Sequence, residues 1–201
     1  MSIIKIIPAQ ELSADFFEPR SFTDDTATIV SEIISQVRRD GDVALHQLAT
    51  KFDSAAPALL EVAPQDLADA AENLRQSQPE LYEALCYSRD LALKFARRQR
   101  ESFDNFEVEL EPGLFTGQKN IPVDRAGLYV PAGRFPLLST VIMTSAPALA
   151  AGCGEVVLCP PPRPHPDGST KAYADAGILA TAYLCGVHRV FACGGAQSIA
   201  A

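Results

Sequence analysis

The chain has 201 residues, of which 47% are hydrophobic and 21% charged, a composition that supports a folded core and argues against intrinsic disorder. The formal net charge of −8 argues against nucleic acid as a partner. The longest apolar stretch, residues 141–151, is interrupted by polar residues and Pro147 and is shorter than the roughly 18 residues of a membrane span, so no membrane association is expected. The N-terminus lacks the pattern of a secretory signal, and we expect it to be a first strand or extended segment.

Acidic residues are concentrated in the first part of the chain. Residues 1–111 hold 21 acidic and 11 basic residues, whereas residues 112–201 hold 4 acidic and 6 basic ones. An anionic ligand would therefore meet a less negative electrostatic potential in the second part of the chain. The alternative interpretation is that the first part is rich in helices with solvated acidic faces.

The cysteines are Cys86, Cys153, Cys159, Cys185 and Cys193, and no two of them have the C-x-x-C spacing of a zinc or redox motif. Four stand in apolar contexts, where cysteine behaves as a small buried hydrophobic residue. The odd number and the lack of a signal pattern predict a reducing compartment, and we expect the cytoplasm.

Helical patterns begin near residue 22. A cap at Thr23–Asp25 and apolar residues at helical spacing predict a helix that ends at Gly41. Asp42 starts a second helix. Residues 59–62 are a short strand candidate. The apolar positions expected for the second helix are Val43, Leu45, Leu48 and Phe52.

Two prolines are placed to begin further helices, Pro64 and Pro79. The second of these helices is predicted over residues 80–101. Its expected apolar face includes Leu81, Leu85, Leu91 and Phe95. Alternation over residues 106–110 then predicts a strand.

A pattern of alternating strands and helices starts near residue 125. The predicted strands are 127–130, 156–159 and 189–192, and the predicted helices are 138–150 and 171–185. Apolar strands that alternate with helices indicate a parallel sheet. The predicted fold class is therefore α/β. Residues 1–125 are expected to form an N-terminal helical region and part of the first α/β domain, and residues 126–201 an incomplete Rossmann-like parallel sheet.

Three turns follow these strands, at residues 129–133, 159–162 and 193–197. Ligands of open parallel sheets bind beyond the carboxyl ends of the strands. In the last turn, two glycines open a helix, which lets the backbone approach an anion, and Gln197 adds an amide. The alternative is an ordinary tight turn. The chain has neither a G-x-G-x-x-G fingerprint nor a phosphate loop, so any dinucleotide site would be atypical.

Tyr129 lies at the end of its predicted strand, before a turn that contains Pro131. An aromatic ring at this position can stack on a nucleotide base or on nicotinamide. The alternative is a tyrosine of the core or of its rim.

The sequence shows no self-contained metal site or acid/base pair. The histidines His46, His165 and His188 form no helical pair and no cluster, and we expect them to be structural or solvated. No serine or cysteine stands in a nucleophile motif.

Four segments, in order, resemble the N-terminal half of the histidinol dehydrogenase family. They are RRDGDVALHQLATKFD at 38–53, GLYVPAGRFPLLSTVIM at 127–143, APALAAGCGEVVLCPPP at 146–162 and CGVHRVFACGGAQSIAA at 185–201. The two glycine-containing motifs are specific as a pair. Ala132 departs from the family, which usually has a second glycine in this turn, and we expect the turn to survive because alanine is small.

The resemblance implies an NAD- and zinc-dependent homodimer that oxidises L-histidinol to L-histidine through the aldehyde, in the last steps of histidine biosynthesis. It implies an aldehyde-dehydrogenase-like architecture, an NAD-binding role for residues 126–201, and NAD contacts at Tyr129 and Gln197. The family's zinc ligands and Glu–His acid/base pair lie downstream of Ala201. No catalytic and no metal-binding residue is therefore expected in this chain, and residues 1–201 alone are expected to be inactive.

Two other functions remain open. The chain can be a non-catalytic short paralogue, or a partner protein of a full-length enzyme. It can also be a different NAD-dependent dehydrogenase, such as an aldehyde dehydrogenase. The lack of a nucleophilic cysteine in a suitable motif argues against this last function.

Overall fold

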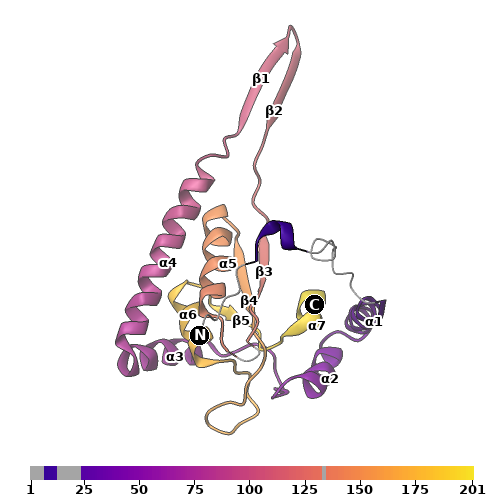
Figure 1. Cartoon of the computed structure of the whole chain (residues 1–201), viewed down its shortest axis with the longest axis vertical. Helices are drawn as coiled ribbons and strands as arrows, with labels where there is room; N and C mark the ends of the chain where they lie inside the picture. The colour runs from indigo at the N-terminus through magenta and orange to yellow at the C-terminus, as the bar shows by residue number, and fades with distance from the viewer. Residues whose placement is uncertain (1–6, 13–23, 133–134) are drawn as a thin grey trace.

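The computed structural model describes residues 7–12, 24–132 and 135–201, and Figure 1 shows the arrangement of their elements. The α-helices of these residues are α1 (Asp24–Asp40), α2 (Asp42–Phe52), α3 (Pro64–Ser77), α4 (Pro79–Arg100), α5 (Leu138–Ala151), α6 (Ala176–Leu184) and α7 (Gly195–Ala200). The strands are β1 (Phe106–Glu111), β2 (Leu114–Gln118), β3 (Arg125–Tyr129), β4 (Glu155–Cys159) and β5 (Arg189–Val190). The predicted α/β class is confirmed.

The N-terminal segment differs from the expected strand. Ala9–Glu11 forms a short 3-10 helix whose residues are exposed, so the prediction of extended chain is wrong there. The predicted first strand otherwise falls on residues 1–6, and Thr23 belongs to the predicted cap of α1. Both lie outside the described residues.

The first two helices meet at Gly41, as predicted, where a φ of 55° suits glycine. A small core forms between them from Val37, Ala44, Leu45 and Leu48. Val43 and Phe52 were expected on the same face but are exposed. The face of α2 that packs runs through residues 44, 45, 48 and 49, and Val43 lies one position off it.

Helices α3 and α4 begin at Pro64 and Pro79, which confirms both predicted starts. The apolar face predicted for α4 is partly wrong. Leu85 and Ala96 are buried, whereas Leu91 and Phe95 are exposed, the latter by 65%. The buried and half-buried positions Leu81, Leu85, Ala92 and Ala96 follow helical spacing, and Leu91 and Phe95 fall beside them.

Strands β1 and β2 form an antiparallel hairpin that projects away from the rest of the structure in Figure 1. Every residue of both strands is exposed. Gly113, with a φ of 83°, makes the turn between them. The hairpin therefore contributes nothing to the main core.

The main sheet has the parallel order β3-β4-β5, which confirms the predicted parallel sheet. The strand candidate at residues 59–62 makes only an isolated antiparallel bridge between Glu61 and Phe191. Two hydrogen bonds, from Val62 N to Val190 O and from Ala192 N to Leu60 O, nevertheless pair this segment with the β5 region. The outer edge of β5 is thereby covered.

Helices α3 to α6 cover one face of the sheet and enclose the main core, which includes Leu158 and Ile178. The start of α6 was predicted at residue 171 but lies at Ala176. The reason is a cap: the Asp175 carboxylate accepts hydrogen bonds from the N–H groups of Gly177 and Ile178, at 2.9 and 3.3 Å. The core contains residues from both sides of position 125, and the division of the chain there stays a prediction.

Charged side chains connect the amino ends of the strands. Arg189 Nε lies 2.7 Å from Glu61 Oε1, and the same guanidinium also donates to Glu155. Arg125 Nε lies 2.8 Å from Glu155 Oε2. The hydrogen bond from Arg189 lowers the pKa of Glu155. Among the described residues, no helix is long and apolar enough to cross a membrane.

Candidate cofactor site

A cavity of about 780 Å³ lies on the face of the main sheet opposite the core. Alternation along β4 places Leu158 in the core and Val157 and Cys159 in the cavity wall. Residues of α2 and α7 complete the wall, and these helices lie on the other side of the sheet from α4, α5 and α6 (Figure 1). The volume is within the range of small-molecule sites.

Tyr129 ends β3 and lines this cavity, where its side chain is half-buried. Its neighbour across the parallel ladder is Cys159, the last residue of β4. Gly127, two residues earlier, lines the same cavity. Because glycine has no side chain, it leaves space above the sheet beside the ring. The ring of Tyr129 is therefore available to a ligand.

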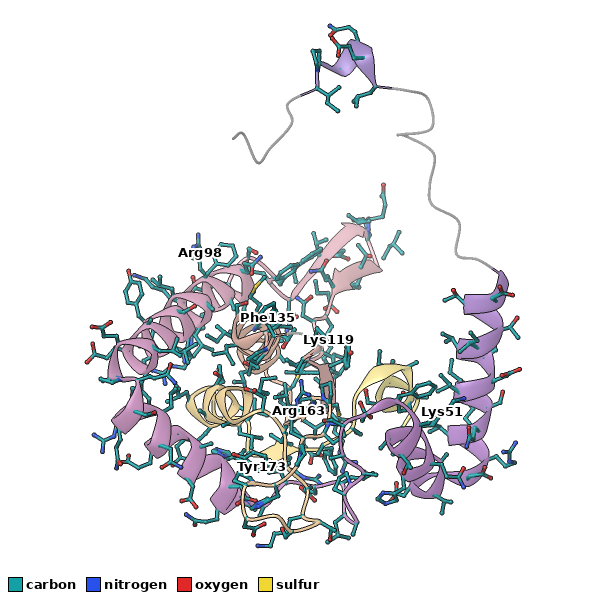
Figure 2. All side chains as sticks on the ribbon, turned by 60° about the horizontal axis from the view of Figure 1, so that its bottom comes forward. Lys51, Arg98, Lys119, Phe135, Arg163 and Tyr173 are labelled. Atoms are coloured by element: carbon teal, nitrogen blue, oxygen red, sulfur yellow. The ribbon has the colours of Figure 1, made fainter. Side chains whose placement is uncertain are left out.

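The three predicted turns meet at one edge of the sheet. Val130 N donates to Cys159 O at 3.3 Å, and Arg163 Nη2 donates to Ala132 O at 2.6 Å (Figure 2 labels Arg163). A side chain on Gly194 would place its Cβ 2.8 Å from Pro161 Cγ. The turn after β5 therefore rests directly on the turn after β4.

Ala132, the departure from the family pattern, is accommodated. It is buried, and no residue other than glycine has a positive φ in the described part of the chain. This turn therefore does not need glycine at position 132. Gly133, the last residue of the predicted turn, lies outside the described residues.

Gln197 is placed differently from Tyr129. It is only 4% exposed and is not among the described residues that line the cavity. Its amide lies against Gly195, where a Cβ would come within 2.6 Å of Oε1. Gly195 also has a φ of 71°. The structure thus does not bring the two predicted cofactor residues into one cavity.

Sequence reasoning missed a polar cluster beside the turns. Ser54 Oγ donates to Pro162 O at 3.2 Å, and Arg163 Nη1 lies 3.5 Å from Ser54 Oγ. Asp53 Oδ2 is buried without a hydrogen-bond partner among the described residues. Burial raises the pKa of Asp53, and the charge of Arg163 opposes this. Neither periodicity nor a motif marks these residues.

The histidines take no part in the cavity. His165 is almost buried, with Nδ1 2.6 Å from Asp167 Oδ1 and Nε2 3.5 Å from Asp66 Oδ2. It also packs edge-on against Tyr173. His46 is half-buried on α2, and His188 is exposed. His165 therefore has a structural position, which joins the 160–175 loop to α3.

The described residues do not fit a zinc ion. No group of three or more His, Cys, Asp or Glu side chains is placed to hold a metal in residues 7–12, 24–132 and 135–201. Zinc usually needs at least three protein ligands.

Comparison with known sequences identifies the family. The family model described as histidinol dehydrogenase matches residues 18–201. The chain belongs to the histidinol dehydrogenase family. It is 42% identical to histidinol dehydrogenase of Xylella fastidiosa (strain Temecula1) over 177 residues, which cover 88% of this chain and 38% of that protein. It is 39% identical to the Salmonella typhimurium enzyme over 181 residues, 90% of this chain and 38% of that one.

A solved structure gives the same result. The crystal structure of histidinol dehydrogenase from Elizabethkingia anophelis superposes with a TM-score of 0.76 at 28% identity, covering 91% of this chain and 40% of that chain. The chain thus spans about two fifths of the length of these histidinol dehydrogenases.

Proposed function

We propose that this chain supplies part of the NAD site of a cytoplasmic, homodimeric histidinol dehydrogenase, which oxidises L-histidinol to L-histidine through the aldehyde. The observation that carries the proposal is Tyr129, which stands at a strand end in the wall of a 780 Å³ cavity, in a chain of this family. Membership of the family supports L-histidinol as the proposed substrate, and the cavity beside Tyr129 supports NAD as the proposed cofactor.

The lining of the cavity favours the ring portions of the cofactor. Apolar side chains such as Leu60 and Phe191 line the cavity together with Tyr129, and this suits nicotinamide or adenine. The carboxylates of Asp42 and Glu61 also line the cavity, and no arginine or lysine does so among the described residues. A diphosphate is therefore better placed outside it, near the strand-end turns.

Gln197 requires a change of side-chain position to contact NAD. Its amide now lies against Gly195, and α7 is a single six-residue segment. We propose that the amide turns away from Gly195 when the cofactor binds.

The chemistry divides between this chain and the rest of the protein. Bound NAD supplies the hydride acceptor. Tyr129 holds and orients a ring of the cofactor beside the apolar part of the cavity wall. Alcohol oxidation also needs a base for the hydroxyl proton. No described histidine or lysine lines the cavity, and Glu61, one of its two carboxylates, is held by Arg189. We propose that the base and the zinc ligands lie in the part of the enzyme that this chain does not span.

Replacement of Tyr129 tests the cofactor site. Tyr129→Ala is expected to weaken NAD binding about fivefold or more, because stacking of a base on an aromatic ring contributes ~1–3 kcal/mol. The measurement is isothermal titration calorimetry of the chain with NAD.

The matched control is Tyr183→Ala on α6, since Tyr183 is exposed and lies outside the cavity. This variant is expected to bind NAD as the unmodified chain does. Equal NAD affinity of the Tyr129 variant and the unmodified chain would contradict the proposed site.

A further inference from the structure

Two cysteines that are far apart in the sequence share the cavity. Cys159 is the last residue of β4, and Cys193 follows β5. Both line the cavity, and each thiol perturbs the pKa of the other. Both are free thiols in this structure.

The ends of the neighbouring strands hold the pair together. Strands β4 and β5 are parallel, with Leu158 opposite Val190, and Phe191 N donates to Leu158 O at 2.8 Å. Cys193 N donates to Phe191 O at 2.8 Å, which closes a three-residue turn beyond β5. The close contact of Gly194 with Pro161 then fixes this turn against the segment that follows Cys159.

The two thiols are not equivalent. The interaction with Cys193 lowers the pKa of Cys159, although burial opposes this. The interaction with Cys159, burial and the nearby carboxylates raise the pKa of Cys193. Cys159 is also the more accessible of the two, because Cys193 is only 5% exposed. Cys159 therefore has the properties of an attacking thiol, and Cys193 those of a second thiol that follows it.

We propose that Cys159 and Cys193 form a dithiol site that exchanges with small-molecule disulfides of the glutathione type and closes to a protein disulfide. The Cys159 thiolate attacks one sulfur of the small disulfide, forming a mixed disulfide and releasing one small thiol. Cys193 then attacks the sulfur of Cys159 and releases the second small thiol. Two protein thiols are oxidised, one small disulfide is reduced to two thiols, and the two protein protons pass to the departing thiolates.

The disulfide would lie in the cavity wall beside the ladder partner of Cys159, Tyr129. It would join the ends of β4 and β5 covalently and change the shape of the wall. The proposal does not depend on the identity of the ligand that the cavity binds.

The test treats the reduced chain with oxidised glutathione and follows it by intact mass and peptide mapping. The expected product is lighter by two hydrogens, retains no glutathione and contains a Cys159–Cys193 peptide pair. Cys193→Ser is expected to retain one glutathione on Cys159, because the second step is blocked. Cys153→Ser, the control, is expected to behave like the unmodified chain, since Cys153 lies outside the cavity.

Three results would overturn the proposal. The unmodified chain could keep its free thiols, it could retain glutathione on Cys159, or it could link other cysteines, such as Cys86 and Cys185, whose thiols interact electrostatically. The peptide map of the unmodified chain distinguishes these results from the expected Cys159–Cys193 disulfide, even if a variant fails to fold.

Discussion

Leu158→Ala is expected to lower the free energy of unfolding by about 2–5 kcal/mol. Leu158 is 0% exposed, in the central strand of the main sheet, and it packs in the core between the sheet and the helices α3 to α6. Truncation removes buried methyl groups and leaves a cavity that the neighbouring helices fill only partly. The measurement is urea unfolding followed by circular dichroism.

Val157→Ala is the matched control for this variant. Val157 is the neighbouring residue in the same strand, but it lines the cavity on the opposite face and is partly exposed. Its truncation is expected to cost about 1 kcal/mol or less. Equal losses for the two variants would contradict the assignment of the two faces of the sheet.

Gly194→Ala is expected to lower the free energy of unfolding by about 1–3 kcal/mol, the usual cost of overpacking. The added Cβ would lie 2.8 Å from Pro161 Cγ and 2.9 Å from Pro161 Cα, so backbone as well as ring must move. The φ of Gly194 is −111°, which any residue adopts, and the effect is therefore steric. Urea unfolding followed by circular dichroism measures this loss of stability.

Gly127→Ala is the control for this contact. A Cβ on Gly127 would lie 3.9 Å from Val157 Cγ2, an ordinary contact, and its expected cost is within about 0.5 kcal/mol. A Gly194 variant as stable as the unmodified chain would show that the turns after β4 and β5 do not touch as described.

Local signals in the sequence predicted most of the fold. Prolines at the first helical position marked the starts of α3 and α4, and a glycine with positive φ separated α1 from α2. Tertiary context decided the rest. The start of α6 depends on a cap at Asp175, and the buried side of α4 depends on its packing against α5.

The candidate site was predictable only in part. The position of Tyr129 at a strand end follows from the order of strands and turns, and the structure places it in a cavity wall. The pairing of Cys159 with Cys193 depends on strand register, and the bond from Arg163 to Ala132 depends on how two loops cross. The sequence carries no pattern for such contacts. The NAD contact of Gln197 stays a prediction.

A dehydrogenase assay of the 201-residue chain, with histidinol, NAD and added zinc, tests the central claim most directly. The described residues form a cavity beside Tyr129, the proposed cofactor residue, but no cluster able to hold zinc. We therefore expect no histidinol-dependent formation of NADH above background. Formation of NADH that requires histidinol would contradict the account, because the chain would then contain the catalytic groups that we place elsewhere in the enzyme.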